Sequence, residues 1–188
     1  MTSKNLKVAV FIDGSNLYFK LKELDLVNLL HYDYRGLSQW LARDREIMSV
    51  SYYVGVVRVE HGSNKKIIEM RKSQQRLFAH LQSSAQNIQI KKGYLMKTNG
   101  IYHEKGVDVN LAVDLLVGAY ENLYDVAIII SSDTDLIPAM RKVRELGKNI
   151  EYIGFAHLPS IALQQHADIS RLLIKEDLEP FVLKLPLV

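Results

Sequence analysis

The chain has 188 residues, with 24 basic and 21 acidic side chains, a formal net charge of +3 and no cysteine. A chain of this length and ordinary apolar fraction can bury a sizeable core, so we expect a single domain over residues 1–188 rather than disorder. The lack of cysteine excludes disulfides, thiolate metal sites and cysteine nucleophiles, and the absence of a signal-peptide pattern or of an apolar run of about 20 residues predicts a cytoplasmic protein outside membranes.

Apolar runs bounded by turn residues predict strands, and amphipathic stretches at helical spacing predict helices. From the amino terminus, these signals predict a strand over residues 8–12, helices from residue 15 and over 35–43, a strand over 50–57, a helix from 62 to 81 and a strand over 88–95. Further along they predict a hairpin or loop over 97–105, a helix over 108–120, a strand over 126–130, a helix over 135–146, a strand over 149–155, a short helix over 159–166 and an irregular, strand-like tail over 171–188.

The alternation of strands and helices predicts a fold of the α/β class, with a mostly parallel sheet covered by helices on both faces. Ligands of such sheets bind beyond the carboxyl ends of the strands, where the strand order reverses. The residues that follow each strand are therefore the first candidates for a functional site.

Two of the predicted strands end in acidic motifs, Phe11-Ile12-Asp13-Gly14-Ser15-Asn16 and Ile129-Ile130-Ser131-Ser132-Asp133-Thr134-Asp135. Gly14 allows a sharp turn behind the first aspartate. If the two strands are neighbours, Asp13 approaches Asp133 and Asp135 at one edge of the sheet. Three such carboxylates repel one another unless they are protonated or neutralised, and oxygen ligands of this kind suit Mg²⁺ or Mn²⁺. Taken singly, each aspartate also fits a helix N-cap or a turn, and Asp135 in particular can cap its helix.

A third acidic candidate opens the helix predicted over 108–120. Asp108 lies in the motif Lys105-Gly106-Val107-Asp108-Val109-Asn110. Its alternative interpretation is a favourable negative charge at a helix N-terminus. Asp114 falls on another face of the same helix, so a structural or supporting role is predicted for it.

With these three blocks in this order, the sequence resembles the NYN domain family of the PIN-like nuclease superfamily. The resemblance rests on Phe11–Leu17, Lys105–Asp114 and Ser131–Ala139, and it extends from about Val8 to about Asp168. It implies a PIN-like, Rossmannoid α/β/α sandwich of three layers. The mostly parallel sheet would have five or six strands, with the first and fourth strands at its centre.

The resemblance also implies metal-dependent cleavage of RNA, with Mg²⁺ or Mn²⁺ as the cofactor. The acidic positions that would bind the metal and carry catalysis correspond to Asp13, Asp108, Asp133 and Asp135. The polar positions that would contact substrate or a water molecule correspond to Asn16, Ser132 and Thr134, and Lys105 is a further candidate to hold a phosphate oxygen. Asp168 falls in a weaker block near the end of the resemblance. We therefore expect a ribonuclease that hydrolyses phosphodiester bonds.

The distribution of charge adds a candidate surface for single-stranded RNA. Residues 58–105 carry ten basic and three acidic side chains, and such an excess can follow a phosphate backbone. The alternative is the solvated face of an ordinary helix. The aromatic candidates for stacking on unpaired bases, each of which also fits strand packing, are Tyr52, Tyr53, Tyr94 and Tyr102. The apolar end of the tail, residues 181–188, leaves a homodimer open.

A second class of function is also open: a non-catalytic RNA- or nucleotide-binding regulatory module that uses the same acidic pocket. Other phosphate enzymes on similar sheets fit less well. A haloacid-dehalogenase-type enzyme requires a second aspartate where Ser15 stands, and a Toprim domain requires an upstream glutamate block. A serine hydrolase requires a Gly-x-Ser-x-Gly elbow, which the sequence lacks.

Overall fold

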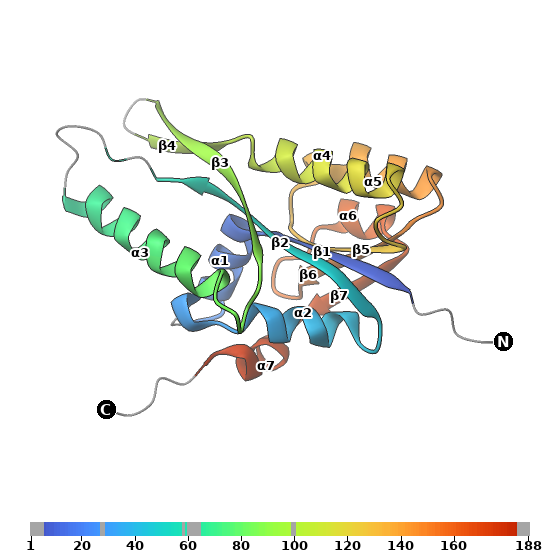
Figure 1. Ribbon diagram of the computed structural model, residues 1–188, viewed down its shortest axis with the longest axis horizontal. Helices are drawn as coiled ribbons and strands as arrows, with labels where there is room; N and C mark the ends of the chain where they lie inside the picture. Colours follow the sequence, from blue (N-terminus) through green and yellow to red (C-terminus); the bar gives the residue numbers. More distant parts are fainter. Residues whose placement is uncertain (1–5, 27–28, 58, 60–64, 99–100, 184–188) are drawn as a thin grey trace.

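The computed structural model describes residues 6–26, 29–57, 59, 65–98 and 101–183. Their strands form one seven-stranded sheet in the order β4-β3-β2-β1-β5-β6-β7 (Figure 1). The strands are β1 (Lys7–Asp13), β2 (Glu46–Val56), β3 (Gln89–Thr98), β4 (Ile101–Lys105), β5 (Val126–Ile130), β6 (Asn149–Phe155) and β7 (Ile169–Leu173). All neighbouring pairs are parallel except β3 and β4, which form the expected hairpin. Its predicted turn at Asn99-Gly100 lies outside the described residues.

Helices cover both faces of the sheet and give three layers (Figure 1). One face carries α1 (Gly14–Glu23), η1 (Leu29–His31), α2 (Tyr34–Ala42), α3 (Lys65–Leu81), α7 (Lys175–Leu178) and η3 (Glu179–Phe181), where η marks a 3-10 turn. The other face carries α4 (Val107–Tyr120), η2 (Thr134–Leu136), α5 (Ile137–Glu145) and α6 (Ile161–His166). The predicted three-layer α/β sandwich with a mostly parallel sheet is confirmed. The sheet has seven strands rather than five or six, because the antiparallel strand β4 adds to six parallel ones. None of the helices in the described ranges is both long and apolar enough to cross a membrane.

The centre of the sheet is formed by β1 and β5, the first and fourth parallel strands in chain order. Val8–Ile12 of β1 pairs in register with Val126–Ile130 of β5. All of β5 and the central part of β1 are buried. Because both faces of these strands are covered, every position requires an apolar side chain, which explains the continuous apolar runs. The carboxyl ends of the two strands therefore meet at the same edge, as the acidic motifs required.

The carboxyl-terminal segment differs from the irregular tail expected over residues 171–188. Ile169–Leu173 forms the edge strand β7, parallel to β6, and α7 and η3 follow it. This strand has a weak sequence signal because Leu173 is its only buried residue, so its side chains show no alternation. The strand-like character is confirmed for residues 171–173, but the helical turns over 175–181 were not expected. Residues 184–188 lie outside the described part.

We name residues 174–183 the carboxyl-terminal strap, because they lie across the segment that leads into α2. Leu178 is fully buried within the core on this face. The strap is tied to residues 31–33 by three hydrogen bonds, from the Tyr32 hydroxyl to the Leu178 carbonyl at 3.3 Å, from the Asp33 N–H to the Phe181 carbonyl at 2.7 Å and from the Leu183 N–H to the His31 carbonyl at 3.1 Å. The strap is therefore part of the folded unit.

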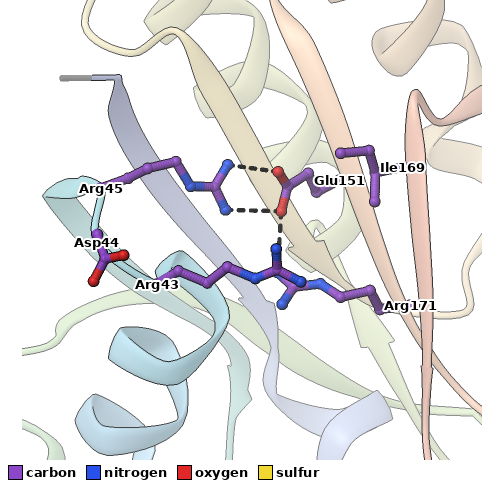
Figure 2. A pocket seen from close by; sticks show the side chains of 6 residues that line it. All are labelled: Arg43, Asp44, Arg45, Glu151, Ile169 and Arg171. Carbon is purple, nitrogen blue, oxygen red and sulfur yellow. Dashed lines mark hydrogen bonds and ion pairs between the residues drawn. The ribbon is translucent and has the colours of Figure 1, made fainter. Parts of the chain in front are cut away.

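A network of charged side chains joins the amino ends of β2, β6 and β7 (Figure 2). Glu151, on β6, is buried and accepts hydrogen bonds from Arg45 at 2.5 and 3.0 Å and from Arg171 at 3.0 Å. Arg45 also donates to the Ala42 carbonyl at 2.8 Å, and Arg171 donates to the Leu41 carbonyl at 2.6 Å. Positive charge is favourable there because the last carbonyl groups of a helix carry partial negative charge. The network therefore anchors the end of α2 to the sheet.

Candidate metal centre

The first acidic residue, Asp13, ends β1 and caps α1. Its Oδ1 accepts a hydrogen bond from the Asn16 N–H at 3.0 Å. Its Oδ2 accepts a hydrogen bond from the Ser131 hydroxyl at 2.8 Å. Donors from α1 and from the end of β5 thus hold both oxygens of this side chain.

Gly14 allows α1 to begin very close to β2. A Cβ atom at this position would lie 2.2 Å from Cε1 of Tyr52, and the Tyr52 hydroxyl donates to the Gly14 carbonyl at 3.2 Å. The sequence suggested that a sharp turn requires this glycine. The structural requirement is instead the approach of the Tyr52 ring, which leaves no room for a side chain.

The second acidic motif follows the buried strand β5. Ser131 is fully buried, and its hydroxyl accepts a hydrogen bond from the Asp133 N–H at 3.0 Å. Asp133 caps the turn η2 by accepting a hydrogen bond from the Asp135 N–H at 2.9 Å. The sequence suggested Asp135 as the cap, but Asp133 has this role, which leaves the Asp135 carboxylate without a capping contact.

Asp108 reaches the same edge from α4, which follows the antiparallel strand β4. Gly106 begins the helix in the left-handed conformation, with φ of 76°, and provides no side-chain cap. Asp108 is the acidic residue of the first turn, where the helix dipole favours its charge. A favourable charge at the helix N-terminus and a role as metal ligand are therefore compatible for Asp108.

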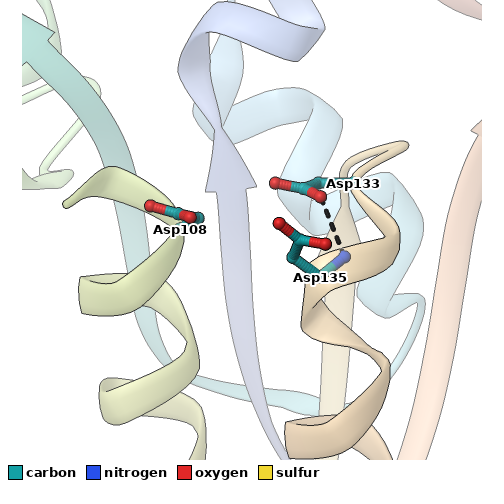
Figure 3. A group of neighbouring side chains, drawn as sticks. All are labelled: Asp108, Asp133 and Asp135. Carbon is teal, nitrogen blue, oxygen red and sulfur yellow. Dashed lines mark hydrogen bonds between the residues drawn. The ribbon is translucent and has the colours of Figure 1, made fainter. Parts of the chain in front are cut away.

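Asp108, Asp133 and Asp135 converge at the carboxyl edge of the sheet (Figure 3). Each contributes one carboxylate oxygen to a group whose atoms all lie within 4.8 Å of one another. None of the ion pairs among the described residues involves these three aspartates. Three negative charges in so small a space repel one another. A hard divalent cation relieves that repulsion, and an all-oxygen donor set fits Mg²⁺ or Mn²⁺.

Asp13 is not a member of this three-oxygen group. It is linked to the group through Ser131, whose hydroxyl donates to Asp13 and accepts from the Asp133 N–H. The structure thus gives Asp13 a capping contact and a contact that positions the loop after β5. Its role as a metal ligand stays a prediction.

The four predicted substrate contacts lie on segments that carry the carboxylates. The Ser132 hydroxyl donates to Oδ1 of Asn16 at 3.0 Å, which joins the first turn of α1 to the loop after β5. This contact orients the Asn16 amide, whose NH₂ group is the end that can donate to an anionic substrate. Thr134 is exposed in η2, and Lys105 is exposed at the end of β4.

Asp114 has the structural role that the sequence predicted. It accepts a hydrogen bond from the Tyr53 hydroxyl at 2.9 Å and pairs with Lys91 at 3.0 Å. Burial raises the pKa of Tyr53, and the negative charge of Asp114 raises it further, so the hydroxyl keeps the proton that it donates.

Asp168, the weaker member of the resemblance, lies at the opposite end of the sheet. It accepts a hydrogen bond from the Ile150 N–H at 2.8 Å, near the amino end of β6, and pairs with Arg144 at 2.8 Å. These contacts hold it at the edge away from the three carboxylates, so it is not one of their neighbours.

The predicted surface for RNA is only partly supported. Tyr52 and Tyr53 are buried, which excludes them as stacking surfaces, while Tyr94 is exposed. The basic segment over 58–105 is divided between the two faces of the sheet: Lys92 lies over the ring of Phe78 on α3, and Lys91 pairs with Asp114 on α4. Arg58 and the side chains of Lys97 and Tyr102 lie outside the described part. The described basic residues therefore do not form one continuous patch.

Sequence reasoning missed two features of this edge. The first is Ser131, the buried hydroxyl between the two acidic motifs. The second is a pair of exposed aromatic residues on α1, Tyr18 and Phe19, whose side chains are 45% and 59% exposed. Their rings meet edge to face, with centroids 5.5 Å apart, about one turn after Asn16. Tyr18 and Phe19 lie off the buried face of α1, which contains Leu17 and Leu21. Two adjacent aromatic residues outside the apolar face of a helix were the signal that could have indicated this exposed pair.

Comparisons with known proteins agree with this geometry. The sequence profile of the NYN domain family matches residues 7–173. A solved structure of a protein of unknown function from Vibrio parahaemolyticus RIMD 2210633 is similar, with a TM-score of 0.68, 22% sequence identity and coverage of 95% of this chain and 98% of that chain. At this identity the likeness concerns the fold alone. No match was found among curated proteins.

Proposed function

The chain belongs to the NYN domain family, and we propose that it is a ribonuclease that hydrolyses phosphodiester bonds of single-stranded RNA with Mg²⁺ or Mn²⁺. The observation that carries this proposal is the convergence of three carboxylate oxygens within 4.8 Å, from Asp108, Asp133 and Asp135. They lie at the carboxyl edge of a parallel sheet, the edge at which α/β folds bind their ligands. The relation of the family to PIN-like nucleases supports the same reaction.

The residues that would hold the cation are Asp108, Asp133 and Asp135, and Asp13 would join them from the end of β1. When bound, a divalent ion neutralises charge on the scissile phosphate and makes water easier to deprotonate. The chain fixes its ligands in advance. Asp133 is held by the Ser131 hydroxyl and by the Asp135 N–H, so little reorganisation is needed when the cation enters.

Other side chains at this edge would orient substrate and water. Asp135 is exposed and has no capping contact, so we assign it the positioning of the attacking water. The NH₂ group of Asn16, oriented by the hydrogen bond from Ser132 to Oδ1, would donate to a non-bridging phosphate oxygen. Lys105 would add positive charge from the end of β4.

The preference for a single strand rests on Tyr18 and Phe19. These exposed rings lie on the helix whose first turn contacts the loop that carries Asp133. Exposed aromatic rings can stack on unpaired bases of any sequence, whereas bases inside a duplex are already stacked. We therefore expect cleavage of single-stranded RNA and little cleavage of duplex RNA.

The decisive experiment measures Mn²⁺- and Mg²⁺-dependent cleavage of labelled single-stranded and duplex RNA by the wild type and by Asp133→Asn. Cleavage of the single strand should fall by more than about a hundredfold in the variant, since even residues that only orient metal ligands are worth about ten- to a hundredfold. The matched control is Asp25→Asn, the same change at an exposed aspartate after α1, and it should keep full activity. Unchanged melting temperatures would show that both variants are folded.

Two outcomes would contradict the proposal. Equal cleavage by the wild type and Asp133→Asn would separate any activity from the carboxylates. Tight RNA binding without cleavage at any Mg²⁺ or Mn²⁺ concentration would favour the regulatory module that uses the same acidic pocket.

A further inference from the structure

A second charged cavity lies at the end of the sheet opposite the carboxylates, beyond the carboxyl end of α2 (Figure 2). It has a volume of about 360 Å³ and is lined by Arg43, Asp44, Arg45, Glu151, Ile169 and Arg171. None of these residues belongs to the candidate metal centre, and nothing in the proposed ribonuclease reaction uses them.

Positive charge exceeds negative charge in this cavity. Arg45 and Arg171 share the one buried carboxylate, that of Glu151. Arg43 is exposed, and its guanidinium group forms no hydrogen bond or ion pair with another described residue. Asp44 also lines the cavity and forms no ion pair within the described ranges, so three guanidinium groups stand against two carboxylates. The guanidinium groups that face the cavity therefore lack a full set of counter-charges.

Arg171 shows the same deficit at the level of single atoms. Both of its hydrogen bonds leave from Nη2, one to the Leu41 carbonyl and one to Glu151. Its Nε is buried and has no hydrogen-bond partner among the described residues, which is rare for a buried donor. Burial lowers the pKa of Arg171, Glu151 raises it, and the positive charges of Arg43 and Arg45 lower it. An additional anion in the cavity would offset the crowding of positive charge.

The backbone of Arg43 gives independent support. This residue ends α2 with φ of 57°, in the region that favours glycine. Its ψ of −131° lies outside the left-handed helical region, so glycine is the residue that would adopt this conformation most easily. An arginine here accepts backbone strain, and strain of this kind is often found at binding sites. It also brings a planar five-donor group to the rim of the cavity.

We propose that this cavity binds the phosphate group of a small ligand, with Arg43 as the principal contact and Arg171 as the second. Guanidinium groups match the geometry of phosphate oxygens and can bind two of them at once. Ile169 is 52% exposed at the wall of the cavity, so it offers an apolar surface for an organic part of the ligand. The site stands whether or not the chain cleaves RNA.

The test is a calorimetric titration of the full chain with inorganic phosphate and, separately, with adenosine monophosphate. Divalent metal is removed with EDTA, because a cation at the carboxylate cluster would also attract phosphate. Ionic strength is held constant with chloride, so general screening does not change along the titration. The wild type should bind saturably. Arg43→Gln should weaken binding roughly tenfold or more, the effect expected for one lost charge-assisted contact.

The matched control is Arg141→Gln, the same change at an exposed arginine on α5, and it should bind like the wild type. Tighter binding of adenosine monophosphate than of inorganic phosphate would identify nucleotides as the source of the phosphate group. Equal affinities would identify free phosphate. The proposal would be overturned by the absence of saturable binding, or by equal affinities of Arg43→Gln and the wild type.

Discussion

The two ends of the sheet carry charged clusters of opposite sign, and they differ in how many of those charges form ion pairs. At the carboxyl end, Asp108, Asp133 and Asp135 face one another with no cationic side chain paired to them among the described residues. At the amino end, the carboxylate of Glu151 is 6% exposed and is bonded by two arginines. Ion pairs such as those of Glu151 connect elements of the fold. Like charges held close together lower the free energy of unfolding until a counter-ion binds.

The difference follows from how each end is built. At the amino end, Arg45 and Arg171 donate hydrogen bonds to the last carbonyl groups of α2. The fold therefore supplies acceptors for these two arginines. At the carboxyl end, the loops after β1 and β5 use their hydrogen bonds to fix one another, through Ser131 and Ser132. The carboxylates are thereby positioned without being neutralised. The following measurements test this contrast.

The largest expected effect is on the amino end. Glu151→Gln should lower the free energy of unfolding by about 3 kcal/mol, because it leaves Arg45 and Arg171 near each other without their shared buried counter-charge. Urea unfolding followed by circular dichroism measures this change. Glu145→Gln, which removes only a surface ion pair with Lys142, is the control and should leave the midpoint unchanged. An equally small change in Glu151→Gln would show that the network is not needed for stability.

The next effect is the response of the carboxyl end to metal. Mn²⁺ that binds only the folded chain should raise the free energy of unfolding by about 2.7 kcal/mol at a concentration one hundred times its dissociation constant. Asp135→Asn should lose most of this gain, since it removes one of the three clustered carboxylates. Thermal unfolding with and without Mn²⁺ provides the measurement. A variant stabilised as much as the wild type would place the cation elsewhere.

The smallest effect has the opposite sign to the first. In metal-free solution, Asp135→Asn should raise the free energy of unfolding by about 0.5 kcal/mol, because it removes one of three mutually repelling charges at an exposed position. Asp168→Asn is the contrasting variant. It weakens an ion pair with Arg144 and should lower stability. Losses of similar size in both variants would contradict the idea that the cluster is strained without its cation.

The sequence predicted the carboxyl end better than the amino end, for a physical reason. Asp13, Asp133 and Asp135 each follow a continuous apolar run, so a local pattern indicated both the strand and the exposed residue after it. Parallel strands place their carboxyl ends at one edge of the sheet, and the resemblance to the NYN family implied that these two strands are neighbours. The sequence did not indicate the hydrogen bonds of Asp13 to Asn16 and Ser131, because the contact with Ser131 joins residues 118 positions apart. Whether Asp13 also binds the metal stays a prediction.

The amino end has no comparable local signature. Arg45, Glu151 and Arg171 are separated by more than a hundred residues of chain at their widest, and each one alone resembles an ordinary surface charge. The order of the strands β2, β1, β5, β6 and β7 in the sheet brings them together, and no local pattern encodes that order. The edge strand β7 was predicted only as part of a strand-like, irregular tail for a related reason, since a strand with little burial has no alternation to detect.

The folded unit is longer than the part of the chain that the family profile recognises, because it includes the carboxyl-terminal strap. The family profile ends at residue 173, yet Leu178 is fully buried beyond that limit, and Phe181 contacts the rings of Tyr32 and Trp40. A fragment trimmed to the profile would expose this apolar wall to solvent and would invite association with other chains. For this protein, the boundary used for expression or crystallisation belongs after residue 183.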